Sequence, residues 1–267
     1  MFKIIFEKYF DAFEKQLKDN NFSLDLPIGE TPVFTTDSFS FYTSVSSVYS
    51  SKIEGEEIEL DSYMKHRFMK KEFLSNYTKK IDDLHLAYSF ARNNILNSKN
   101  ILQAHSILTQ NILSKTSRGT IRTENEYVTN EHGQIEYVAT NPLNVKTEIQ
   151  KLFSDIQKLL KKDISETQTF YFAIVIHLIF LKIHPFEDGN GRMSRLLEKW
   201  FLAQKLGEKA WYVPSEKYYY QNLNDYYRNL QRLGWGYESL NYDRCLPFLL
   251  MLPSSLNPKN TEGIKNT

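Results

Sequence analysis

The chain has 267 residues, of which 41% are hydrophobic and 14% aromatic, so it can bury a sizeable core and is not a disordered chain. Its 33 basic and 32 acidic residues give a formal charge of +1, which argues against the broad basic surface of a nucleic-acid-binding protein. The single cysteine, Cys245, excludes an internal disulfide and a cysteine-based zinc site.

The apolar segments do not predict a secretory signal or a membrane span. Residues 1–8 mix apolar with charged side chains, and no small-residue cleavage site follows them. The longest apolar run, residues 170–181, would cover about 18 Å as a helix, whereas the hydrocarbon core of a membrane is about 30 Å thick. We therefore expect a buried core helix, no membrane association and a cytoplasmic location.

Most of the chain has apolar residues at helical spacing. Pro27, Gly29 and Pro32 interrupt the pattern after the first helix, and Asp37 is a suitable N-cap for the second. The expected helices cover approximately residues 2–18, 37–55, 73–97, 100–114, 143–161, 167–183, 190–206, 215–233 and 238–251.

One segment has a different pattern. Residues 127–129 and 135–138 favour β-structure and flank a turn-type stretch, which predicts a β-hairpin. We therefore expect an all-α fold with one short hairpin. The expected division is an N-terminal helical extension (1–72), a compact core (73–252) and a flexible tail (253–267).

The segment from His184 to Arg195 carries the clearest chemical signal, and it reads His-Pro-Phe-Glu-Asp-Gly-Asn-Gly-Arg-Met-Ser-Arg. Pro185 ends the preceding helix, and the two glycines lie where the next helix begins. Free backbone N–H groups at a helix N-terminus bind anions, and the helix dipole adds to the attraction. An anion-binding site is therefore predicted here.

The charged residues of this segment fit phosphate chemistry. Arg192 and Arg195 are three residues apart, so both can reach one side of the first turn and clamp phosphate oxygens. Asp188 could hold Mg²⁺ against those phosphates. His184, with an ordinary pKa of about 6.5, suits a general base. Together these residues predict nucleotidyl or phosphoryl transfer.

The same twelve residues match the Fic motif, His-x-Phe-x-[Asp/Glu]-Gly-Asn-Gly-Arg-x-x-Arg, at every fixed position. The chain therefore resembles Fic (Fido) domain proteins, a family of mostly AMP transferases that act on protein hydroxyls. The resemblance implies a helical core with the motif between two central helices, ATP as substrate and Mg²⁺ as cofactor.

The resemblance also implies a role for each motif residue. His184 would take the proton from a Tyr, Ser or Thr hydroxyl of a target protein, and Asp188 would hold the metal. Phe186 would anchor the loop in the core. The residues implied to bind the phosphates, through backbone, amide and guanidinium groups, are Gly189, Asn190, Gly191, Arg192 and, for the γ-phosphate, Arg195.

A second motif precedes the core. Residues 50–55, Ser-Ser-Lys-Ile-Glu-Gly, would by themselves read as a helix end with a solvated Glu54. They also resemble the family's inhibitory motif, [Ser/Thr]-x-x-x-Glu-[Gly/Asn], in the class II arrangement. Ser50 would open this motif, and Glu54 would pair with Arg195, the arginine that the γ-phosphate needs. Glu56 stands where relatives often have an apolar residue.

The hairpin and a tyrosine pair resemble two further parts of the family site. The hairpin resembles the flap that binds an extended target segment, although it could be an ordinary surface hairpin. The flap residues that could border the nucleotide are Val138, Ala139, Thr140 and Asn141. Tyr226 and Tyr227 resemble a pair that lines the adenine pocket, or they belong to the core. Some relatives carry an Asn a few residues after the tyrosine pair, but this chain has Gly-Trp-Gly at 234–236 instead. His177 is expected to be a core histidine.

The leading hypothesis is a protein adenylyltransferase restrained by Glu54. The same residues would serve the removal of AMP, and a non-catalytic ATP-binding sensor is an alternative from another class. Gly191 argues against the kinase branch, which has Lys there, and transfer of UMP or phosphocholine stays open. The expected partner is a target protein at residues 127–141, with no nucleic acid. The aromatic faces of 2–17 and 218–227 fit either a homodimer or core packing.

Overall fold

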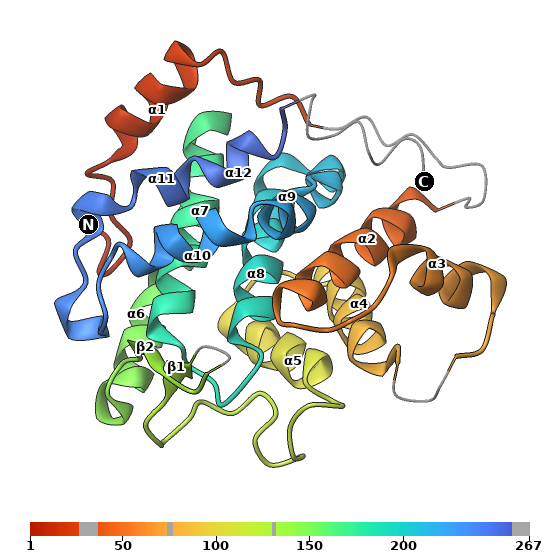
Figure 1. Cartoon of the computed structure of the whole chain (residues 1–267). Coiled ribbons are helices and arrows are strands. Elements are labelled where there is room, and N and C mark those ends of the chain that lie inside the picture. The colour runs from red at the N-terminus through yellow and green to blue at the C-terminus, as the bar shows by residue number, and fades with distance from the viewer. Residues whose placement is uncertain (27–36, 74–76, 130–131, 258–267) are drawn as a thin grey trace.

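The computed structural model describes residues 1–26, 37–73, 77–129 and 132–257. Two helices form its centre, α7 (Glu166–Ile183) and α8 (Asn190–Leu206), which pack against each other (Figure 1). Ser165 starts α7 with a capping box that includes Gln168. Apolar residues on all sides of α7 require neighbours on all sides, and the surrounding helices supply them.

The other helices of the core surround this pair. Helix α7 has the length and mean hydropathy (1.3) of a membrane-spanning helix, but 78% of it is buried inside the protein, as expected for a core helix. Further helices of the core are α4 (Lys79–Arg92), α5 (Ser98–Leu108), α6 (Pro142–Lys161), α9 (Ser215–Gln221) and α10 (Leu223–Gln231).

The N-terminal extension shares the main hydrophobic core instead of forming a separate unit. Helix α1 (Phe10–Asp19) packs on α7, and its Phe13 is fully buried. It begins later than predicted because the backbone N–H groups of residues 3–5 donate to the Asp155 carboxylate. Helix α2 (Ser38–Ile53) is capped by Asp37 as predicted, and it packs against α4, α8 and α9. Helix α3 (Leu60–Met69) was not predicted.

The C-terminal part differs from the prediction. The helix expected at 215–233 is broken at Asn222 into α9 and α10. The helix expected at 238–251 consists of 3₁₀ turns (237–239 and 242–244), α11 (Leu246–Leu249) and α12 (Met251–Ser254), because prolines interrupt longer helices. The predicted tail was wrong at its start, since Leu256 is buried. Residues 258–267, Pro27 and Pro32 lie outside the described residues.

The predicted hairpin is present as β1 (Tyr127–Thr129) and β2 (Ile135–Val138), which pair antiparallel with Tyr127 opposite Val138. One edge of β2 is partly covered, because Val138 N–H donates to the carbonyl of Trp235 at 2.9 Å. The indole N–H of Trp235 donates to the Ile135 carbonyl at 3.3 Å. The outer edge of β1 is thus the better candidate for pairing with another segment.

Candidate active site

Side chains within the loop between α7 and α8 fix its conformation. His184 ends α7 in the left-handed region (φ +54°, ψ 62°), and Pro185 prevents the helix from continuing. Asn190 accepts from the Phe186 N–H at 2.9 Å and donates to the Phe186 carbonyl at 2.8 Å. The amide of Asn190 therefore holds the loop, whereas a phosphate contact was predicted for it; its backbone N–H stays available.

Phe186 anchors this loop on a residue that the sequence analysis missed. Its ring stacks on His105 of α5 with centroids 3.5 Å apart. Nδ1 of His105 accepts from the Gly119 N–H at 2.9 Å, so Nε2 carries the hydrogen and donates to the Asp188 carbonyl at 2.9 Å. Burial lowers the pKa of His105 to about 4, so this ring is neutral at pH 7.

A second missed residue, Arg122, ties the loop to the hairpin. Its guanidinium donates to the carbonyls of His184 (2.7 Å), Glu124 (2.6 Å) and Thr140 (2.6 Å). Its backbone N–H donates to the Pro185 carbonyl at 3.0 Å. One buried cation thus fixes the backbone of His184 relative to the base of the flap.

The start of α8 has the features of an anion site. Gly189 is the N-cap at φ +81°, and an added Cβ there would lie 2.9 Å from the Thr109 side chain. The N–H groups of residues 190–192 precede the first intrahelical bond, which Met193 donates to Gly189. Arg192 is buried, and its Nε and Nη1 have no hydrogen-bond partner among the described residues. Such groups are normally satisfied, so this arrangement fits an anionic ligand.

Asp188 could supply the protein ligand of a magnesium ion. Its side chain is 50% exposed, and Oδ1 accepts from Arg192 at 3.2 Å and from the Gly189 N–H. No cluster of three or more His, Cys, Asp or Glu side chains occurs in the described ranges. Mg²⁺ is typically held by one or two carboxylates together with substrate phosphates, so a single carboxylate beside an anion site fits that ion.

His184 is oriented for proton acceptance. Its Nδ1 lies 3.2 Å from the Leu181 carbonyl, which can only accept, so Nδ1 carries the hydrogen and Nε2 has the lone pair. Burial lowers the pKa of His184 to about 4, and the ring is therefore neutral at pH 7.

The predicted ion pair between Glu54 and Arg195 is present. Arg195 Nη2 donates to Glu54 Oε1 at 2.6 Å and to the Ser50 carbonyl at 3.0 Å, and Nε donates to Ser50 Oγ at 2.8 Å. Burial raises the pKa of Glu54, but the charges of Arg195 and Arg192 outweigh it and the net shift is downward. A Cβ at Gly191 would collide with the Glu54 carboxylate, so that carboxylate lies against the start of α8. Glu56 points elsewhere, to Lys80 at 2.6 Å.

A cavity adjoins these groups, lined by Glu54, Gly191 and Arg195 together with residues of α7, α10 and the hairpin. The hairpin contributes Val128, Glu136 and Tyr137. The predicted nucleotide-bordering residues, Val138, Ala139, Thr140 and Asn141, do not line it. The backbone groups of Val138, Ala139 and Thr140 are hydrogen-bonded to Trp235, Glu126 and Arg122, in that order. Asn141 is the N-cap of α6.

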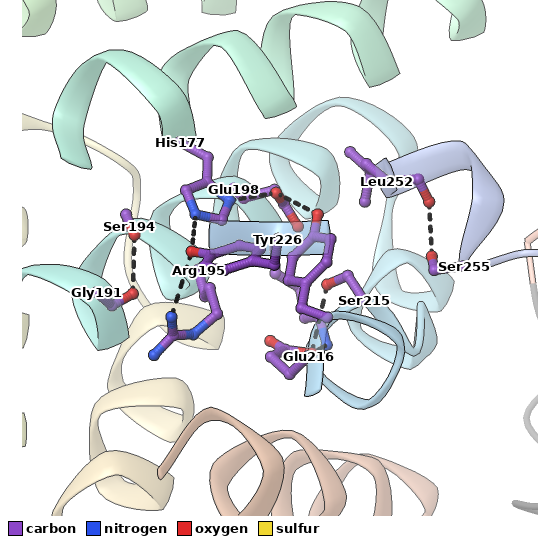
Figure 2. A network of polar contacts seen from close by, with 12 residues as sticks. His177, Gly191, Ser194, Arg195, Glu198, Ser215, Glu216, Tyr226, Leu252 and Ser255 are labelled. Atoms are coloured by element: carbon purple, nitrogen blue, oxygen red, sulfur yellow. Dashed lines mark hydrogen bonds and ion pairs between the residues drawn. The ribbon is translucent and has the colours of Figure 1, made fainter. Parts of the chain in front are cut away.

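The two tyrosines of α10 differ. Tyr227 is partly exposed at the cavity, and its hydroxyl donates to the Ile53 carbonyl at the end of α2, at 2.9 Å. Tyr226 also lines the cavity but is buried, and its hydroxyl contacts Arg195 (3.4 Å) and His177 (3.0 Å) (Figure 2). The predicted core position of His177 is correct. Tyr226 is thus a polar link inside the core as well as a cavity wall.

Lys182 is a further cavity residue that the sequence analysis did not single out. Its ammonium lies 4.1 Å from the centre of the Tyr137 ring, and no ion pair with a described residue is present. Burial lowers the pKa of Lys182 to about 8. A cation therefore faces the cavity under the flap.

Several solved structures, among them the following three, resemble this chain over 96% of its length. A Fic family protein from Desulfovibrio desulfuricans G20 has a TM-score of 0.68 at 19% identity, covering 96% of this chain and 72% of its own. A Fic domain containing signaling protein from Bacteroides thetaiotaomicron VPI-5482 has 0.66 at 16%, covering 96% of both chains. Residues 134–508 of Fic-1 from C. elegans have 0.59 at 16%, covering 96% of this chain and 70% of theirs. At these identities the likeness shows the fold.

A comparison with curated proteins gave no match. The model of the Fic/DOC family matches residues 95–202, which include α5, the hairpin, α7, the loop from His184 to Gly189 and most of α8. Residues 95–202 of this chain therefore resemble a Fic/DOC family domain.

Proposed function

We propose that this protein is an adenylyltransferase that moves AMP from ATP to a Tyr, Ser or Thr hydroxyl of a target protein. The observation that carries the proposal is the combination at one loop of a neutral His184, whose Nε2 has the lone pair, with a buried Arg192 beside the N–H groups at the start of α8. The Nε and Nη1 of Arg192 have no hydrogen-bond partner among the described residues. A base next to an anion site is the arrangement that nucleotidyl transfer requires.

In the proposed reaction His184 Nε2 accepts the proton of the target hydroxyl. The hydroxyl oxygen attacks the α-phosphorus of ATP, the bond between the α-phosphorus and the bridging oxygen breaks, and pyrophosphate leaves. The N–H groups of residues 190–192 and the Arg192 guanidinium stabilise the charge on the phosphates. Mg²⁺, held by Asp188, would neutralise phosphate charge when bound.

We further propose that Glu54 restrains this reaction, in the class II manner. Its carboxylate holds Arg195 and lies against Gly191, the two places where the β- and γ-phosphates would bind. Nucleotide that enters with Glu54 in place would be shifted from in-line geometry, and a displacement of about 1 Å can cost on the order of 100-fold in rate. The resting protein is therefore autoinhibited.

The target is proposed to bind as an extended segment along the hairpin, residues 127–141. Because Trp235 covers part of the β2 edge, the outer edge of β1 is the edge that can accept a further strand. Tyr127 of β1 and Ile135 of β2 are exposed on the hairpin and offer apolar contacts.

The test is the intact mass of three forms after incubation with Mg²⁺-ATP: the natural chain, Glu54→Gly, and Glu54→Gly/His184→Ala. The account predicts that Glu54→Gly alone gains one or more AMP units. A gain of phosphate mass would replace transfer of AMP with kinase chemistry. An AMP gain that persists without His184 would contradict the role given to this base. If Glu54→Gly binds ATP but gains no mass, self-modification is excluded, and transfer to a strictly external target, removal of AMP or nucleotide sensing becomes the better account.

A further inference from the structure

A chain of buried polar side chains reaches Arg195 from the core side (Figure 2). Tyr219 of α9 donates its hydroxyl hydrogen to Glu198 Oε2 of α8 at 2.8 Å. The same oxygen lies 2.7 Å from His177 Nδ1 of α7. His177 Nε2 lies 3.0 Å from the Tyr226 hydroxyl of α10, and Arg195 Nη1 donates to that hydroxyl at 3.4 Å. Four helices thus meet in one network.

The donors in this network run in one direction. Glu198 Oε2 accepts from the Tyr219 hydroxyl, and as an acceptor it faces Nδ1 of His177, so Nδ1 carries the hydrogen and Nε2 accepts from the Tyr226 hydroxyl. Burial raises the pKa of Tyr226, which keeps that hydroxyl protonated. Its oxygen lone pairs are then directed toward the Arg195 guanidinium. Glu198 and His177 therefore determine which way the Tyr226 hydroxyl points, although neither is in hydrogen-bond contact with Arg195.

The two sides of the Arg195 guanidinium have different partners. Nε and Nη2 are held by Ser50 and Glu54 of the inhibitory segment, whereas Nη1 is held by Tyr226. When Glu54 withdraws, the Nη2 ion pair is lost but the Tyr226 contact is not. Glu198 also carries a cost, since its Oε1 is buried without a partner among the described residues, and such a group lowers stability. Because the Glu198 carboxylate lowers stability in this way, we infer that it serves a purpose other than stabilising the fold.

We propose that His177, Glu198 and Tyr219 are positioning residues: they orient the Tyr226 hydroxyl, which holds Arg195 ready for the γ-phosphate once Glu54 has withdrawn. The inference rests on the proposed function, in which Arg195 binds that phosphate. It assigns the buried network to recognition of the triphosphate instead of to core stability alone.

The test compares ATP and ADP affinities, by calorimetry with Mg²⁺, in the full chain carrying Glu54→Gly. This background is expected to bind ATP more tightly than ADP, because only ATP reaches Arg195 with a γ-phosphate. Adding Tyr226→Phe or His177→Leu is expected to reduce the ATP-to-ADP preference about tenfold, the usual scale for a hydrogen bond to a charged group, with little change for ADP. His177→Gln, which keeps an acceptor for Tyr226, should restore part of the preference.

Tyr88→Phe is the matched control. It removes a buried tyrosine hydroxyl from the neighbouring network, where Tyr88 donates to Glu216 at 2.5 Å, and it should leave the preference unchanged. If Tyr226→Phe and His177→Leu keep the full preference, or weaken ATP and ADP equally, the positioning role is overturned while the proposed function stands. Equal ATP and ADP affinities in the Glu54→Gly background itself would overturn the role of Arg195 and, with it, this inference.

Discussion

Two cations one turn apart on α8, Arg195 and Lys199, both reach the inhibitory helix α2, but in different surroundings. Lys199 donates to Glu216 of α9 at 2.5 Å and to Ser46 of α2 at 2.7 Å. Arg195 pairs with Glu54 at 2.6 Å. The side chains of Lys199 and Glu216 are 1% and 0% exposed, whereas Glu54 is 28% exposed at the cavity.

The comparison distinguishes a permanent ion pair, Lys199 with Glu216 (the anchor), from an exchangeable ion pair, Arg195 with Glu54 (the switch). The partner of Lys199 belongs to the helices that follow α8 and is enclosed by protein, so no ligand can replace it. The partner of Arg195 comes from the N-terminal extension and faces a cavity, so a phosphate can take its place. The same chemistry, a buried ion pair, therefore stabilises the fold at one position and leaves a contact that can be exchanged at the other.

The largest expected effect is on the anchor. Glu216→Ala leaves Lys199 buried without its counter-charge, and breaking such a pair lowers the free energy of unfolding by about 3–5 kcal/mol. Urea unfolding measures it. Glu59→Ala is the control, because that exposed side chain pairs with Lys52 at 3.5 Å and exposed pairs contribute at most about 1 kcal/mol. Equal losses in the two variants would remove the distinction between the sites.

A third buried cation, Arg122, sharpens the comparison because its side-chain partners are backbone carbonyls. Arg122→Lys cannot reproduce the fork that holds His184, Glu124 and Thr140. In the Glu54→Gly background we expect AMP transfer to fall on the order of 100-fold, because His184 is displaced, with ATP affinity preserved. Transfer rates and calorimetry give the two values. A parallel loss of ATP affinity would show that Arg122 shapes the nucleotide site itself.

A smaller effect is expected at the switch. Glu54→Gln removes the charge of a partly exposed group while Ser50 continues to hold Arg195, so the free energy of unfolding should fall by about 1 kcal/mol. Urea unfolding beside Glu216→Ala provides the comparison. A loss as large as that of Glu216→Ala would make Glu54 a structural residue.

The smallest effect is a pH dependence. The pKa of Glu54 lies below its ordinary value of 4.5 in the folded protein, so its contribution to stability is complete above about pH 4.5 and is lost as the pH falls through the folded value. The stability difference between the natural chain and Glu54→Gln should be constant from about pH 7 to 5 and shrink only below that. A difference that already declines above pH 5 would mean that the carboxyl pKa is raised.

The parts of the site that were predictable lie close together in the sequence. The twelve residues from His184 to Arg195 form one loop and one helix turn, so spacing alone placed their charges together. His105 and Arg122 contact residues that are 83 and 62 positions away, and isolated residues carry no local sign of such contacts. Tyr226 was named through the resemblance, but its contact with His177, 49 positions away, was not predicted. The pairing of Glu54 with Arg195, 141 positions apart, was predicted only through the resemblance to an inhibitory motif.

The fold was predicted best where apolar periodicity and end signals agree, as in α2 with its Asp37 cap and α8 with Gly189 and Gly207 at its ends. It was predicted worst after residue 214. The tyrosines at 218–220 and 226–227 continue an aromatic pattern across the break at Asn222, and the short helices beyond it depend on tertiary packing. Helix α3 was missed because acidic residues around its start obscure the pattern, although Tyr63 is fully buried.

The central claim is that one carboxylate controls access to Arg195, and the most direct measurement is the rate of AMP incorporation by Glu54→Gly relative to Glu56→Gly. The two carboxylates are two residues apart and almost equally exposed, at 28% and 29%, but Glu56 pairs with Lys80 outside the site. The account predicts a rise on the order of 100-fold for Glu54→Gly and none for Glu56→Gly. Equal stimulation by both would contradict it, because a loosened end of α2 would then be the cause.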